Sequence, residues 1–175
     1  MQRAQIMGKS FAFVSGQILT ENYDATIKKL AFPGENRFVQ LVPARVVAGQ
    51  KHLETALEHA LSSFKNGTNF ARKPELEFIV RLLAEKQLEK ALKKAEFADE
   101  PLVLVLELKG AAKAKNLKAG KGKSPSAVKE INEIEKRLNF REKIFSLGKN
   151  KKYLMDFFNI SETELKTLKD LKNPL

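Results

Sequence analysis

Within RFVQLVPARVVAGQKHL, residues 37–53, the hydrophobic pattern changes from that of a strand to that of a helix. Residues 37–42 are apolar and branched enough to form a strand in a partly buried sheet. After Gln50 the apolar residues follow the spacing that places them on one helical face: Leu53, Ala56, Leu57, Ala60, Leu61 and Phe64. We therefore expect a strand followed by a helix, with Gly49 at the turn between them and Gly67 as the left-handed end of the helix.

Further elements are expected on both sides of this stretch. Residues 11–15 read as a short strand, and residues 102–108 form an apolar run interrupted only by Glu107, which is typical of a central strand. Pro74 suits the first turn of a second helix, and the apolar residues after position 87 indicate a third. The sequence thus predicts one domain over residues 1–175 with an α+β fold, in which a small, mainly antiparallel sheet packs against several helices. We expect a core of three strands and three helices.

The remaining segments show weaker patterns. Residues 24–30 are expected to form a short helix that ends before Pro33-Gly34. Residues 109–123 contain six lysines, four alanines, three glycines and no acid. Such a segment buries too little apolar surface to offset the entropy of ordering it, so we expect a mobile lysine-rich loop at about 109–124. A helix opening at Ser124-Pro125 and a last helix, capped by Ser161 with Glu164, complete the pattern.

The charge balance is strongly basic. Lysine and arginine number 32 against 21 acids, which gives a formal charge of +11 and a pI near 9.8. A surplus of this size favours a polyanionic partner, and in a cytoplasmic protein that is chiefly nucleic acid. A lysine-rich surface that serves solubility alone would have the same composition. No run approaches the roughly 18 apolar residues of a membrane span and no leader is visible, so we expect a cytoplasmic protein with no membrane partner.

No metal or cysteine chemistry is predicted. The chain has 0 cysteines, which excludes disulfides, thiolate-bound zinc and cysteine nucleophiles. His52 and His59 are the only histidines, and their separation corresponds to about 10.5 Å along a helix, too far for both rings to bind one metal ion. We expect His52 to cap or pack the helix.

Catalytic motifs are likewise incomplete. Residues 122–124, Gly-Lys-Ser, lack the second glycine of a phosphate-binding loop, because Leu117 stands at its position. Two carboxylate pairs are close in sequence without a supporting histidine or nucleophile: Glu54 with Glu58, and Glu75 with Glu77. We therefore expect no catalytic residue, no cofactor and no enzymatic activity.

Residues 65–73, KNGTNFARK, join the first two predicted helices and combine cations, asparagines and one aromatic residue. Cations neutralise phosphate, asparagine can read base edges and aromatic rings stack on bases, so this composition suits a single-stranded nucleic-acid end. The alternative is an ordinary helix connection, with Gly67 as the cap, Asn69 in a turn and Phe70 buried. The residues alone leave both interpretations open.

These motifs, in this order, resemble one family: the small, non-catalytic subunit of the KEOPS complex, or PRPK-binding protein family, of archaeal type. The resemblance rests on a Gly-x-x-His-Leu-x-x-Ala pattern and on scattered matches after it: Gly49, His52, Leu53, Ala56, Gly67, Asn69, Ala71, Arg72, Glu77, Arg81, Gln87 and Ala91. KEOPS places a threonylcarbamoyl group on an adenosine beside the tRNA anticodon (t6A). The resemblance therefore implies a role in tRNA modification.

The resemblance also implies partners and site residues. In this family the subunit docks on the kinase-like ATPase of the complex and, in archaea, captures the CCA end of tRNA, while a separate transferase subunit performs the chemistry. The tRNA-binding residues implied here are Lys65, Asn69, Arg72, Lys73 and Arg81. Glu77 and Gln87 are implied as internal hydrogen-bonding partners that fix the helix pair. The alternative is a generic basic RNA- or ribosome-associated domain that binds through the lysine-rich loop.

The chain departs from the family pattern in two places. After the third helix the family has Lys-Phe-Gly-Ile, whereas residues 94–97 here are Lys-Ala-Glu-Phe, and a left-handed Glu96 would cost about 1 kcal/mol. The family also tends to end in an apolar helix that supports partner contacts. Here residues 165–171 offer only a leucine edge, so Phe157, Phe158 and Ile160 either substitute for it or belong to the core.

Overall fold

The structure is a computed structural model that describes residues 2–18, 37–96, 100–109, 128–129, 132–133, 136, 140–142, 151–158 and 161. Its strands form one sheet with the order β1-β2-β4-β3, and a fifth strand pairs with the end of β2. The strands are β1 Gln2–Ile6, β2 Lys9–Ile18, β3 Val39–Pro43, β4 Leu102–Glu107 and β5 Phe140–Glu142. Every pairing is antiparallel, which confirms the predicted sheet type.

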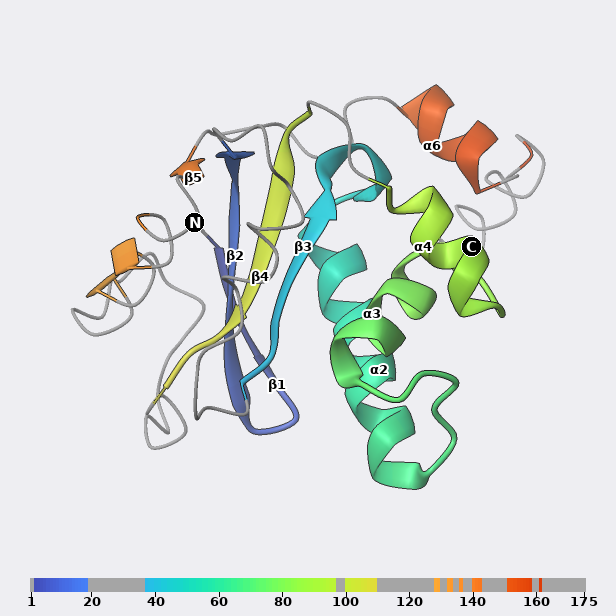
Figure 1. The fold of residues 1–175 in the computed structure, drawn as a ribbon, viewed down its shortest axis with the longest axis horizontal. Coiled ribbons are helices and arrows are strands. Elements are labelled where there is room, and N and C mark those ends of the chain that lie inside the picture. Colours follow the sequence, from blue (N-terminus) through green and yellow to red (C-terminus); the bar gives the residue numbers. More distant parts are fainter. Residues whose placement is uncertain are drawn as a thin grey trace, which may run out of the picture.

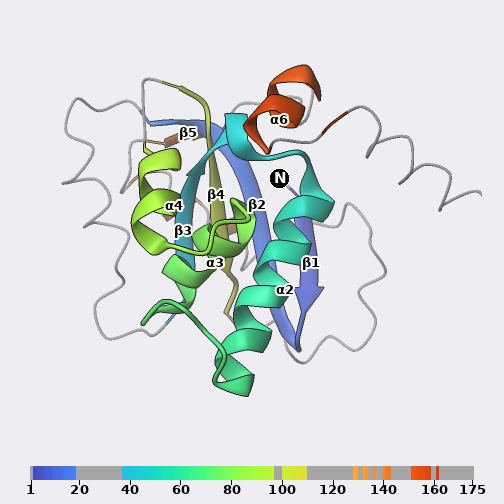
Figure 2. The same ribbon diagram turned by 90° about the vertical axis from the view of Figure 1, so that its right-hand side faces the viewer.

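The helices lie on one side of this sheet, as Figure 1 and the perpendicular view in Figure 2 show for α2, α3 and α4. Their bounds are α2 Gln50–Asn66, α3 Pro74–Leu82, α4 Leu88–Lys94 and α6 Lys151–Phe157, and a short 3-10 helix, η1 Ala44–Val46, follows β3. The described residues thus form a sheet covered by helices, which confirms the predicted α+β class.

The three predicted strands and three predicted helices are all present, but the expected count of strands was too low. Strand β1 precedes them and pairs with β2 through a two-residue turn at Met7 and Gly8, whose φ angles are 51° and 79°. Positive φ at both positions is the geometry of the tight turns that join hairpin strands. The usual sequence signal for such a turn is Asn-Gly, and Met-Gly does not carry it.

Strand β4 is central and buried on both faces. Side chains of a strand alternate between faces, and Val103 and Val105 join the core beneath the helices. On the opposite face Leu104 and Leu106 are also 0% exposed. Burial on both faces explains why the sequence of β4 is a continuous apolar run instead of an alternating one.

Some expectations fall outside the described residues. These are the helix at 24–30, the lysine-rich loop beyond Lys109, the Gly-Lys-Ser motif at 122–124 and the last helix after Ser161. Between 125 and 138, where a helix is expected, the described residues are helical.

The end of α2 and the start of α3 follow the sequence signals, whereas the end of α3 does not. Gly67 has φ 66° at the end of α2, and Pro74 is the first residue of α3, both as predicted. After α3, however, Ala84 takes the left-handed conformation with φ 51°. The amides of Ala84 and Glu85 donate to the carbonyls of Arg81 and Val80 at 3.3 and 3.1 Å, the bond pair of a Schellman cap that usually contains glycine.

The end of α4 differs from the expected left-handed cap. The helix ends at Ala95 with φ −84°, and Glu96 is not among the residues with positive φ. Instead, the Arg45 guanidinium donates to the carbonyls of Lys94 and Glu96 at 3.2 and 2.8 Å and pairs with the carboxylate of Glu100. A distant arginine therefore binds the carbonyls at and just beyond the end of α4.

Candidate functional site

The α2–α3 connection, defined as residues 67–73, joins the C-terminal end of α2 to the first turn of α3. Its path is set at both ends, since Gly67 turns the chain out of α2 and Pro74 starts α3. The Gly67 and Thr68 amides donate to carbonyls in the last turn of α2 at 3.4 and 2.9 Å. The connection is therefore a tight reversal between two helices that pack together.

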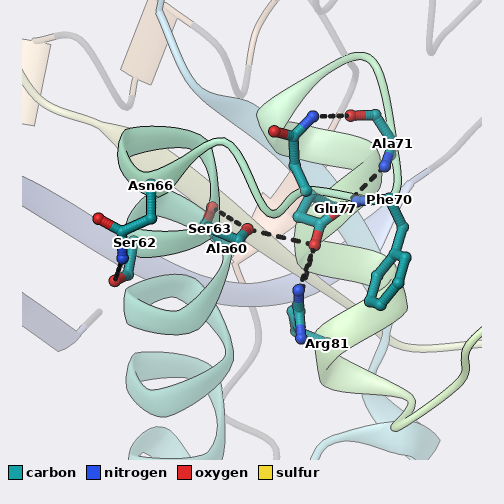
Figure 3. A network of polar contacts seen from close by, with 9 residues as sticks. Ala60, Ser62, Ser63, Asn66, Phe70, Ala71, Glu77 and Arg81 are labelled. Carbon is teal, nitrogen blue, oxygen red and sulfur yellow. Dashed lines mark hydrogen bonds and ion pairs between the residues drawn. The ribbon is translucent and has the colours of Figure 1, made fainter.

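Glu77 holds this connection from inside (Figure 3). Its side chain is 0% exposed, and Oε2 accepts hydrogen bonds from the backbone amides of Phe70 and Ala71, both at 2.8 Å. Oε1 accepts bonds from the Arg81 guanidinium, at 2.9 Å from Nε and 2.8 Å from Nη2, and from the Ser63 hydroxyl at 3.2 Å. One carboxylate thus links α2, the connection and α3, which confirms the predicted internal role of Glu77.

The surroundings keep Glu77 ionised. Burial alone raises the pKa of a carboxyl group, but here the Ala71 and Phe70 amides and the Arg81 cation outweigh it, and the net pKa of Glu77 is lowered from 4.5. A buried carboxylate is stable only when its oxygens are paired. The fold of the connection therefore depends on this set of bonds being complete.

Asn69 and Arg81, two of the five residues expected to bind tRNA, make internal contacts. The Asn69 side-chain amide donates to the Ala71 carbonyl at 2.8 Å. Arg81 uses Nε and Nη2 on Glu77, its side chain is 28% exposed, and its guanidinium lies 4.9 Å from the centre of the Phe70 ring. Arg81 thus uses the N–H of Nε and one N–H of Nη2 on Glu77, and the N–H groups of Nη1 and the second N–H of Nη2 remain for an external contact.

Lys65, Arg72 and Lys73 are placed differently. All three are exposed, and within the described part of the chain none of them takes part in an ion pair or side-chain hydrogen bond. They lie at the end of α2 and the end of the connection, on either side of Phe70 in the sequence. Their charges are available to an external anion.

The Phe70 side chain is 60% exposed, so the alternative in which it is buried is wrong. Its backbone amide is fixed by Glu77, so the exposure does not come from a loosely held segment. Sequence reasoning left the burial of this ring open because nothing in KNGTNFARK distinguishes an inward from an outward aromatic residue.

Gln87 does not have the expected role. It precedes α4 as its N-cap, its side chain is exposed, and within the described residues that side chain makes no hydrogen bond. Only its backbone carbonyl bonds inside the helix, to the Ala91 amide at 3.0 Å. The internal bonds at the opposite end of α3 come instead from His52.

His52 connects the start of α2 to the end of α3. The Ala48 amide donates to Nδ1 at 3.2 Å, so the ring proton is on Nε2, which donates to the Leu82 carbonyl at 3.0 Å. The ring also meets Phe158 edge-to-face at 5.6 Å between centroids. Burial lowers the pKa of His52 from 6.5, against a smaller raising effect of the Leu82 bond. This confirms the expected capping and packing role.

Phe157 and Phe158 also pack on the protein. Phe157 lies against the core cluster and beneath the Lys94 ammonium group, 5.3 Å from its ring centre. Both residues of the pair are only partly exposed, and their rings meet edge-to-face at 5.1 Å. Of the two alternatives, the structure supports packing against the core for Phe157, while Phe158 packs on His52 and Ile160 lies outside the described residues.

The described residues hold no arrangement typical of catalysis or metal binding. No three histidine or acidic side chains among them come close enough to bind a metal ion. Glu54 bonds to Gln50 and Lys51, and both carboxylate oxygens of Glu77 accept internal hydrogen bonds. Within the same residues, no helix has the length and apolar character needed to span a bilayer.

Comparison with models of known protein families gives a match. The family model described as "Kinase binding protein CGI-121" matches residues 17–173, which is most of the chain. No curated protein matches the chain significantly.

Proposed function

The chain belongs to the CGI-121 family of kinase-binding proteins, and from this premise we propose that it is the small, non-catalytic subunit of a KEOPS complex that makes t6A in tRNA. In this role it binds the kinase-like ATPase subunit with one surface and the 3′ CCA end of tRNA with another. It acts in the cytoplasm and meets the threonylcarbamoyl transferase only through the complex.

The observation that carries the RNA part of the proposal is the outer surface of the α2–α3 connection. Lys65, Arg72 and Lys73 are exposed and flank the exposed Phe70 in the sequence, while the backbone at Phe70 and Ala71 is fixed from within by Glu77. Exposed cations next to an aromatic ring are the combination that binds single-stranded nucleic acid. Asn69 and Arg81 adjoin the same connection, and each already uses part of its donors on internal contacts.

The proposed contribution of the chain to modification is positional. A tRNA held by its acceptor end has its anticodon loop at a raised effective concentration near the transferase. Removal of the chain should therefore reduce the use of tRNA and leave the intrinsic chemistry of the transferase in place.

The RNA part is tested by polarisation binding of tRNA with and without its CCA end. We expect the truncated tRNA to bind markedly more weakly to the purified chain. Equal affinity for both tRNAs would contradict capture of the acceptor end. Deletion of residues 110–123 serves as the second arm: a collapse of RNA affinity would instead favour the generic RNA-binding domain that uses the lysine-rich loop.

The kinase part is tested separately, by co-purification from native extract and identification of the bound proteins. We expect a small kinase-like ATPase among them, because the family is one of kinase-binding proteins. Recovery of the ATPase without any measurable RNA binding would identify a protein scaffold and contradict the tRNA role alone.

A further inference from the structure

The most exposed large apolar side chain in the described residues is Phe70. It is 60% exposed, compared with 45% for Met7 and 42% for Leu92. Exposure of a phenylalanine in water costs free energy that burial would recover. Here the ring is also held outward, because the amides of Phe70 and Ala71 are both bound to the buried Glu77.

One side of this ring already has a planar partner. The Arg81 guanidinium lies 4.9 Å from the ring centre, and Arg81 is itself fixed by two bonds to Glu77. With so much of the residue exposed, the ring keeps surface on which a second planar group can stack. The supporting cation and the fixed backbone mean that little side-chain entropy is lost when such a group binds.

The charges around the ring indicate what that planar group is. Arg72 and Lys73 follow Phe70 within three residues, both are exposed, and neither has an ion-pair partner among the described residues. A nucleotide offers a π-face for the ring and a phosphate for the neighbouring cations, and RNA-binding surfaces combine these contacts. An apolar peptide would leave the cations without a counter-charge.

We propose that Phe70 is a stacking platform for one unpaired base of RNA, with Arg81 supporting the ring and Arg72 and Lys73 binding the adjoining phosphates. This inference rests on the proposed function, since it names the residue that receives a base of the single-stranded tRNA end. Stacking accepts any base, so the platform supplies affinity for an unpaired end, and base identity is not read by the ring.

The experiment compares wild type, Phe70→Leu and Phe70→Trp, with Leu92→Ala as a matched change at another exposed apolar residue. The probe is a fluorescently labelled RNA hairpin with a single-stranded ACCA tail, together with versions in which one tail nucleotide at a time is abasic. We expect Phe70→Leu to weaken binding by about 5- to 150-fold. Phe70→Trp should retain the affinity, and Leu92→Ala should leave it unchanged.

Two further readouts separate stacking from a general loss of structure. The slope of log affinity against log salt should be the same in Phe70→Leu and wild type, because no phosphate contact is removed. At one tail position the abasic probe should bind wild type and Phe70→Leu equally well, since the base that stacks is then missing.

Wild-type affinity in Phe70→Leu, with tRNA binding still dependent on the CCA end, would overturn the platform and leave the proposed function intact. Loss of the CCA dependence in wild type would contradict the proposed function, while the hairpin series would still decide whether Phe70 stacks on a base. If Phe70→Leu loses the ATPase and keeps the hairpin, the ring contacts protein and the inference is wrong.

Discussion

The two ends of helix α3 are anchored by different chemistry. At its start Glu77 is an ionised, fully buried carboxylate whose partners are two amides, a hydroxyl and a guanidinium. At its end His52 is a neutral ring between the Ala48 amide and the Leu82 carbonyl. Around Glu77 the outer surface is open, with an exposed Phe70, whereas beside His52 the residues Leu82 and Leu83 are each 1% exposed.

The difference shows how a connection can be rigid and still present its side chains to solvent. A carboxylate beneath the chain satisfies the Phe70 and Ala71 amides from inside, so the Phe70 side chain is not needed to hold the connection. At the other end of α3 the apolar side chains themselves hold the structure through packing. We infer that the charged anchor serves the binding surface and the neutral anchor serves stability alone.

The largest effect is expected from removal of the charged anchor. Glu77→Gln should lower the free energy of unfolding by about 3–5 kcal/mol, because it leaves the Arg81 charge without its partner and turns an amide group toward the backbone donors. Urea denaturation measures this change. The control is Glu75→Gln in the same helical turn, which should stay within about 0.5 kcal/mol of wild type. If Glu77→Gln lowered the free energy of unfolding no more than Glu75→Gln does, the buried carboxylate would not anchor the start of α3.

Removal of the neutral anchor should lower the free energy of unfolding by a smaller amount. His52→Ala loses two hydrogen bonds and the ring contact with Phe158, and we expect a loss of about 1–3 kcal/mol in the same measurement. His59→Ala, one exposed residue on the same helix, is the matched control and should change little. RNA affinity should be retained in His52→Ala. A selective loss of RNA binding there would contradict a purely structural role.

The two anchors should also be separated by pH. The folded chain has a lowered pKa at His52, so below its ordinary value of 6.5 the unfolded chain binds more protons, and stability falls as pH drops. Glu77 adds a second loss below its ordinary value of 4.5, for the same reason. Stability measured from pH 7.5 to 4 should therefore decline in both ranges, and His52→Ala should flatten only the upper one. If the stability of His52→Ala still fell with pH in the upper range as it does in wild type, His52 would not be the cause of that decline.

The smallest effect is expected at the cap that ends α3, where Ala84 takes the left-handed conformation. Ala84 has φ 51°, which favours glycine, so Ala84→Gly should raise the free energy of unfolding by about 1 kcal/mol. Thermal unfolding would show this as a raised midpoint. Ala95→Gly is the control, because Ala95 has φ −84° and gains nothing from glycine. Destabilisation by both substitutions would mean that the strain at Ala84 is not relieved.

The sequence predicted what depends on local pattern. The apolar runs of β2, β3 and β4, the helical spacing after Gln50, and the punctuation at Gly67 and Pro74 each act within a few residues, and the structure agrees with all of them. Strand β1 was missed because QRAQI is mostly polar and its turn lacks the usual residues. The strand is stabilised by its pairing with β2, and no local sequence pattern in β1 predicts this pairing.

What could not be predicted depends on contacts between distant residues. Arg45 binds the carbonyls of Lys94 and Glu96, which are 49 and 51 residues away in the sequence. The local sequence after α4 therefore gives no hint of this contact. The family pattern implied an internal role for Glu77, but it did not indicate that Glu77 binds the Phe70 and Ala71 amides and so leaves the Phe70 ring outside. The same pattern misplaced Gln87, whose side chain is in solvent.

The central claim is that RNA binds on the open side of α3, over its charged anchor. The most direct test compares tRNA affinity across a range of salt for Arg72→Glu with Lys73→Glu and for a control of equal charge on α4, Lys90→Glu with Lys93→Glu. We predict that only the first pair weakens binding strongly, and that it lowers the salt slope by about 0.7 for each lost phosphate contact. Equal losses in the two pairs, or none in the first, would contradict the claim.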